Sequence, residues 1–195
     1  MQTMMDYKAD LLQRYWKYRD EQFSDEQALF DNHYARPASP PVFTRSKAWK
    51  NVIINSDASE QEKKRLLDLI PKDEWHKWFG SMNSSQALAQ SVLGNLFVYD
   101  SLHYLSELKD GEGISLFGKE RTSFGNFVME HKIDYLGEPR PTSLDGYISG
   151  DYRVAIECKF IEAEVGPCSR PGLITRVIIV TVLTQCKGQE VHAVH

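Results

Sequence analysis

The spacing of hydrophobic and polar positions changes along this chain, first at helical period and later at the period of a strand. Residues 5–23 place apolar side chains at helical spacing among charged ones, which predicts an amphipathic helix. Residues 58–70 predict a second helix, with Asp57 and Glu60 as its capping box. Between the two helices, residues 35–43 hold three prolines and predict a loop or an extended connection.

A longer helix is predicted over residues 86–108, because Ser84 and Ser85 offer N-cap hydroxyls directly before it. Its apolar stripe consists of Leu88, Val92, Leu96, Tyr99 and Leu102. Four segments with strand-like character follow, at residues 113–118, 126–137, 142–149 and 152–162. A long helix that leads into an antiparallel meander predicts an α/β fold of the mixed α+β type.

The last of these strands alternates with a period of two. One face carries Val154, Ile156, Cys158 and Phe160, and the other carries Arg153, Ala155, Glu157, Lys159 and Ile161. Glu157 and Lys159 therefore share a face, and the small Ala155 leaves room beside them.

The loop before this strand decides whether Asp145 meets Glu157. Partners in a hairpin advance in opposite directions along the chain, so the length of the loop fixes the register. A two-residue loop places Asp145 opposite Ile156, on the wrong face. A three-residue loop, from Gly150 to Tyr152, places Asp145 opposite Glu157. We predict the three-residue loop, because such loops are common and often carry a glycine.

Two carboxylates that face each other across neighbouring strands call for a cation between them. Directly opposed side chains have Cβ atoms about 4.5–5.5 Å apart, where like charges are destabilising. Mg²⁺ prefers one or two carboxylates together with water and phosphate oxygens. Such a metal lowers the pKa of bound water and neutralises developing charge. Lys159 would orient or deprotonate the attacking water, or stabilise the pentavalent transition state, so these roles match phosphodiester hydrolysis.

The segment SLDGYISGDYRVAIECKF, which contains this constellation, resembles the core motif of the PD-(D/E)XK superfamily, the restriction-endonuclease-like fold. The preceding segments SSQALAQSVLGNLF and FVMEHKIDYLG resemble the first core helix and first core strand of an uncharacterised bacterial branch of it. The likeness covers roughly residues 84–170. Pro141 lies four residues before Asp145 instead of next to it, so this sequence departs from the literal motif.

The resemblance implies a central mixed sheet flanked by helices and a site for Mg²⁺, or for Mn²⁺ in its place. It assigns the metal to Asp145, Glu157 and the backbone carbonyl of Cys158, and it makes Lys159 the catalytic lysine. Glu130, on the polar face of the strand over residues 126–137, is a candidate third acid near the metal. The alternative for Glu130 is an ordinary solvated strand residue.

Many members of the superfamily also carry a glutamate on the first core helix, where this chain has Gln86 or Gln90. We expect Gln86 to be an ordinary polar residue early in its helix. The resemblance further implies nucleic acid, and DNA in particular, as the substrate. Because many members dimerise to cut both strands, it also implies a homodimer.

Composition sets limits on these expectations. The chain has 195 residues, 42% of them hydrophobic and 26% charged, which is typical of a soluble globular protein. Its net charge of −4 is unlike that of a protein that coats nucleic acid non-specifically. The charged N-terminus lacks the apolar run of a secretory signal, and no segment reaches the roughly 18 apolar residues of a membrane helix. We therefore expect a cytoplasmic protein without a membrane partner.

We expect three regions: a helical N-terminal extension over residues 1–83, a nuclease-like core over residues 84–170, and an atypical, truncated tail over residues 171–195. The tail is set apart because the sequence becomes apolar and β-branched near Pro171. Three functions compete: a Mg²⁺-dependent DNA endonuclease of restriction, repair or defence type, a catalytically inactive binding or structural relative, and a plain α+β protein with incidental hairpin charges.

Overall fold

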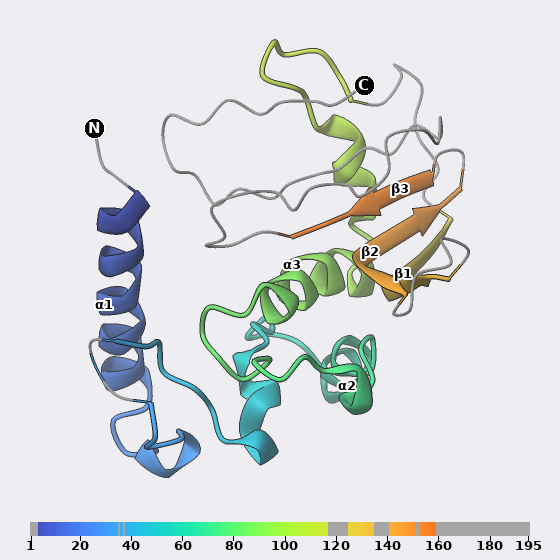
Figure 1. The fold of residues 1–195 in the computed structure, drawn as a ribbon. Helices are drawn as coiled ribbons and strands as arrows, with labels where there is room; N and C mark the ends of the chain where they lie inside the picture. Colours follow the sequence, from blue (N-terminus) through green and yellow to red (C-terminus); the bar gives the residue numbers. More distant parts are fainter. Residues whose placement is uncertain are drawn as a thin grey trace.

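The computed structural model describes residues 4–34, 36, 38–116, 125–134, 141–150 and 153–158. These residues form an antiparallel three-stranded sheet, helix α3 beside it and helix α2 on the far side of α3, while helix α1 stands apart (Figure 1). The predicted mixed α+β class is therefore confirmed. In the described part of the chain the sheet is purely antiparallel, so the mixed sheet stays a prediction.

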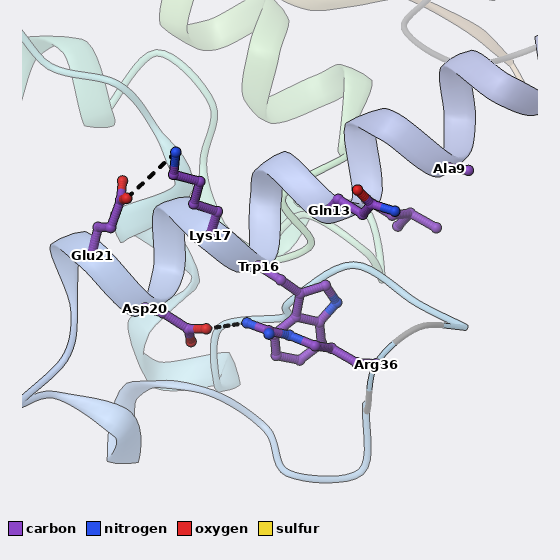
Figure 2. A pocket seen from close by; sticks show the side chains of 8 residues that line it. Ala9, Gln13, Trp16, Lys17, Asp20, Glu21 and Arg36 are labelled. Carbon is purple, nitrogen blue, oxygen red and sulfur yellow. Dashed lines mark hydrogen bonds and ion pairs between the residues drawn. The ribbon is translucent and has the colours of Figure 1, made fainter.

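Helix α1 spans Met4–Gln22 and confirms the first predicted helix. Its Trp16 is only 6% exposed, and the indole Nε1 of Trp16 donates a hydrogen bond to the carbonyl of Ser39 at 2.9 Å. Arg36 lies over the Trp16 ring, 4.9 Å from its centroid, and forms an ion pair with Asp20 (Figure 2). These contacts fasten α1 to the connection that follows it.

This connection, which we call the arm and define as the described residues between 30 and 43, returns to the segment before α3. Val42 forms an isolated antiparallel bridge with Ser81, and the backbone N–H of Phe43 donates to the carbonyl of Gly80 at 2.8 Å. A Cβ at Gly80 would lie 2.9 Å from the Phe43 carbonyl oxygen, so this close approach requires glycine. The predicted extended connection is confirmed at this end of the arm.

Helix α2 spans Glu60–Leu67 and is shorter than the predicted helix over residues 58–70. Its N-cap is Ser59, whose hydroxyl accepts from the N–H of Glu62 at 3.3 Å, while the Glu62 carboxylate accepts from the N–H of Ser59 at 2.7 Å. The predicted capping box of Asp57 and Glu60 is thus wrong by two residues. Asp57 instead lies in a turn, where its N–H donates to the side chain of Asn55.

Replacing Ser59 with alanine is expected to destabilise the protein by about 0.5–2 kcal/mol, because one backbone donor of α2 loses its acceptor. The hydrogen bonds from Ser59 also lower the pKa of Glu62 below its ordinary value. The contribution of Glu62 is therefore present above its ordinary pKa and is lost as the pH falls through the lowered one. Urea unfolding of Ser59→Ala should show a smaller deficit at acidic than at neutral pH. An equal deficit from Ser24→Ala, at an exposed serine outside any helix N-cap, would contradict this role.

Helix α3 spans Ser85–Val98, and the hydroxyl of Ser84 caps it by accepting from the N–H of Ala87 at 3.3 Å. The Ser84 N-cap is confirmed, but the helix ends well before residue 108. Its buried residues belong to two clusters, one with the sheet and one with α2, so the single predicted stripe is wrong. Val92 of that stripe is 36% exposed, whereas Leu93 is buried at 1%.

A left-handed residue ends α3. Asp100 has a φ of 52°, and its N–H donates to the carbonyl of Phe97 at 3.2 Å. The N–H of Ser101 donates to the carbonyl of Leu96 at 2.6 Å. Together these bonds form a Schellman motif, with aspartate where glycine is usual. Residues Leu102–Glu107 follow as the separate 3₁₀ helix η4.

The sheet has the order β1-β2-β3, with β1 at Asn126–Ile133, β2 at Thr142–Ser149 and β3 at Arg153–Ile156. The predicted end of the last strand, from residue 159 on, lies outside the described residues. The predicted strand over 113–118 is described only to residue 116, and there Ser115 makes an isolated bridge with Lys109.

Candidate active site

The register of β2 and β3 is the one that a three-residue loop produces. Gly146 pairs with Ile156, and at the other end of the ladder Ser149 pairs with Arg153. The loop therefore runs from residue 150 to residue 152, which confirms the prediction. When the register is continued by one residue, Asp145 lies opposite Glu157, directly after the end of β3.

The register of β1 and β2 brings a third acid into the same row. Met129 pairs with Gly146, and His131 pairs with Leu144. Because the register is the same before and after Glu130, this residue lies opposite Asp145. One acid from each of β1 and β2, and one directly after β3, are thus aligned across the sheet.

Glu130 has an unusual backbone conformation for a strand residue, with a φ of 51°. A non-glycine residue in this left-handed region costs about 1–3 kcal/mol, and such residues concentrate at active sites and ligand-binding positions. Two donors hold its carboxylate: the side-chain amide of Gln86, at 2.8 Å from Oε1, and the hydroxyl of Ser143, at 2.8 Å from Oε2. The strained residue is therefore fixed in place through its side chain.

Gln86 itself is held in one orientation. Its Oε1 accepts from the backbone N–H of His76 at 2.7 Å, and its Nε2 also donates to the carbonyl of Glu74 at 3.1 Å. Since the oxygen is occupied by a donor, the amide nitrogen must face Glu130. Gln86 is a polar residue early in its helix, as expected, but it is only 7% exposed and its amide contacts Glu130. No local pattern marks it, because its partners lie far away in the sequence.

Gln90, the other candidate on α3, does not belong to this group. It is fully buried, and its Nε2 donates to the carbonyl of Leu66 at 2.9 Å. Its contact therefore joins α3 to α2 and does not reach the acids.

Asp145 is oriented by the strand beside it. Its Oδ2 accepts from the backbone N–H of Cys158 at 2.6 Å. Cys158 is 3% exposed and lies in the core cluster, so its main chain lies beside Asp145 while its sulfur packs inward, as the alternation predicts. The carbonyl of Cys158 as a metal ligand stays a prediction. Lys159 lies outside the described residues.

A cavity of about 760 Å³ opens beside the acids. Glu130 and Asp145 both line it, together with residues of the arm, of α1 and of the start of α3. Among the described residues Glu157 does not line it. The geometry thus brings Glu130 and Asp145 to one cavity and relates Glu157 to them through the register.

The residues present fit a hard divalent cation. Within the described ranges, no three His, Cys, Asp or Glu side chains are grouped as a ready metal site. Mg²⁺ in phosphate-handling sites needs only one or two carboxylates, since water and phosphate oxygens complete its shell. Glu130 and Asp145 supply two carboxylates on one cavity.

Comparison with known families bears on one of the competing functions, the plain α+β protein. The model of the family described as "Restriction Endonuclease associating with ARP" matches residues 10–185. The chain belongs to this family. Neither the curated proteins nor the solved structures contain a match.

Membership of a restriction-endonuclease family confirms the resemblance seen in the hairpin motif. It points to a nuclease, and hence to a nucleic acid substrate, and disfavours a plain α+β protein with incidental charges. The match also runs through the N-terminal helices and past residue 170, while the three expected regions stay a prediction. No helix in the described part of the chain is long and apolar enough to cross a bilayer.

Proposed function

We propose that this protein hydrolyses phosphodiester bonds of nucleic acid, as a Mg²⁺- or Mn²⁺-dependent DNA endonuclease of restriction, repair or defence type. The observation that carries the proposal is that Glu130 and Asp145 line one cavity, while the register, continued past the end of β3, places Glu157 beside Asp145. Like charges at opposed positions are destabilising, and Glu130 adds backbone strain. A bound divalent cation would offset the charge repulsion, and backbone strain like that of Glu130 is concentrated at ligand-binding positions. We also propose that the fold of this chain has the core arrangement of the restriction endonucleases.

In this proposal the metal is held by Asp145, Glu157 and the Cys158 carbonyl, with Glu130 as a further carboxylate. A metal bound there supplies a polarised phosphate and a bound water of lowered pKa. The chain's own groups fix the acids: the Cys158 N–H orients Asp145, and Gln86 orients Glu130.

Lys159, two residues after Glu157, is proposed as the catalytic lysine. A lysine ammonium is a compact positive charge on a flexible stem. Placed beside the scissile phosphate, it would stabilise the charge of the transition state or orient the attacking water. Its place in the sequence and the family membership support this role.

The direct test incubates supercoiled plasmid and single-stranded DNA with the purified chain in Mg²⁺, in Mn²⁺ and in EDTA. We expect nicking or linearisation with either metal and none in EDTA. Cleavage that persists in EDTA would contradict metal dependence, and the absence of cleavage with either metal on both substrates would contradict the enzyme.

We also propose two binding partners for this chain, a second copy of itself and ARP. Many members of the superfamily dimerise to cut both strands, so we propose a homodimer, which light scattering of the purified chain would measure. The family description names an association with ARP, and we extend that association to this chain.

Gln86→Ala is expected to weaken Mn²⁺ binding and cleavage by roughly 10–100-fold, because Glu130 loses the donor that orients it. Gln90→Ala is the matched control: Gln90 is also buried on the same helix but contacts α2. Calorimetric titration with Mn²⁺ should therefore separate the two variants even if both lose stability. Equal Mn²⁺ affinities for the two variants would contradict the positioning role of Gln86.

A further inference from the structure

The cavity beside Glu130 and Asp145 has an aromatic wall. Trp78, from the segment before α3, and Tyr34, from the arm, both line it. Their ring centroids lie 5.6 Å apart, and the ring planes meet at 81°. Trp78 is 40% exposed, which is unusual for so large an apolar side chain and gives the cavity an accessible indole.

The Trp78 ring has a cationic neighbour as well as Tyr34. The ammonium of Lys77 lies 5.0 Å from the ring centroid, and among the described residues Lys77 does not line the cavity. Trp78 is therefore a partly exposed indole on the wall of the cavity. A partly exposed indole that lines the same cavity as two carboxylates offers a stacking surface beside the proposed chemistry.

The remaining wall carries groups that suit a phosphate chain. Lys8 of α1 and the hydroxyl side chains of Ser84 and Ser85 line the same cavity. Lysine and serine side chains are common contacts of the phosphate backbone. The cavity therefore combines contacts for a base and for phosphates with the proposed catalytic acids.

The size and walls of the cavity favour one nucleotide over a stretch of duplex. Its volume of about 760 Å³ lies within the range of pockets that hold small ligands, about 300–1,000 Å³. Paired bases in a duplex present their edges in the grooves, whereas an unpaired base offers its face to an aromatic side chain. The arm encloses one side and is held there by the Val42–Ser81 bridge.

We infer that this cavity binds one unpaired nucleotide of the substrate strand, with its base against Trp78 and Tyr34 and its phosphate toward Glu130 and Asp145. The inference rests on the proposed function and names its substrate class: single-stranded or locally unpaired nucleic acid. A continuous duplex is then a poorer ligand unless a nucleotide is extruded from it.

Fluorescence anisotropy tests the inference with a labelled oligothymidylate and a labelled blunt hairpin duplex, in Ca²⁺ as an oxygen-binding divalent ion. We expect the full chain to bind the oligothymidylate at least about tenfold more tightly than the hairpin. Trp78→Ala should weaken binding of the oligothymidylate by roughly tenfold or more, and Trp78→Phe should keep most of it. Tyr104→Ala, at a 55% exposed tyrosine outside the cavity, should change neither affinity.

Equal binding of oligothymidylate by wild type and Trp78→Ala would overturn the inference, as would a hairpin bound as tightly as the single strand. Failure here is distinct from failure of the proposed function. Metal-dependent cleavage with no effect of Trp78 overturns only the substrate class. A Trp78-dependent preference for the single strand without cleavage supports the cavity and counts against the nuclease.

Discussion

Asp145→Asn is expected to reduce DNA cleavage about a thousandfold, which corresponds to about 4 kcal/mol of transition-state stabilisation. The substitution removes the negative charge that the proposed metal needs. It keeps an oxygen that can accept the hydrogen bond from the Cys158 N–H, now 2.6 Å from Oδ2, so the strand pairing survives. The unfolding midpoint in urea should therefore change little while the cleavage rate collapses.

Asp134→Asn is the control for this result, since Asp134 is an exposed acid just past the end of β1. It makes the same change of charge on the same sheet, away from the row of acids. If the cleavage rate fell equally in both variants, cleavage would be responding to the net charge of the protein. An Asp145→Asn variant that cuts at the wild-type rate would remove Asp145 from the active site.

Leu93→Ala is expected to destabilise the protein by about 2–5 kcal/mol, because it leaves a cavity where α3 packs on the sheet. Leu93 is 1% exposed and lies in the core cluster with Phe127 and Ile156. Its Cδ1 also fills the space above Gly146, where an added Cβ would lie only 2.8 Å away. Urea unfolding followed by circular dichroism would measure the loss.

The same contact makes a second substitution informative. Gly146→Ala alone should cost about 1–3 kcal/mol, because its methyl group presses on Leu93. Combined with Leu93→Ala it should cost less, so the double variant would be more stable than the two losses added together. Strict additivity would show that Leu93 does not limit the space at Gly146. Because Gly146 follows Asp145, cleavage by Gly146→Ala should also fall.

The hairpin was predictable from the sequence because its register depends on local quantities. The alternation of Val154 and Ile156 sets the faces, and the loop length then places Asp145 opposite Glu157. The class of the fold follows from the same periodicities. The sequence also limited the N-cap of α3 to Ser84 or Ser85, and Ser84 is the cap.

Some features could not be predicted from the sequence. They depend on contacts between residues far apart in the chain, or on a choice between two similar local patterns. Gln86 serves Glu130 from a different element, 44 residues away, so no spacing marks it. The capping box was misplaced because two overlapping pairs, Asp57 with Glu60 and Ser59 with Glu62, lie at the start of α2, and Asn55 binds Asp57 in a turn. The early end of α3 depends on Asp100 adopting a left-handed conformation that aspartate reaches only occasionally.

The most direct test of the central claim is to locate a bound metal. Crystals of the full chain grown with Mn²⁺ would be measured for anomalous scattering. We predict a peak at the row of Glu130, Asp145 and Glu157, within coordination distance of carboxylate oxygens, and its loss in Asp145→Asn. An empty row at saturating Mn²⁺, in crystals of protein that cleaves DNA, would contradict the assignment of these acids to the active site.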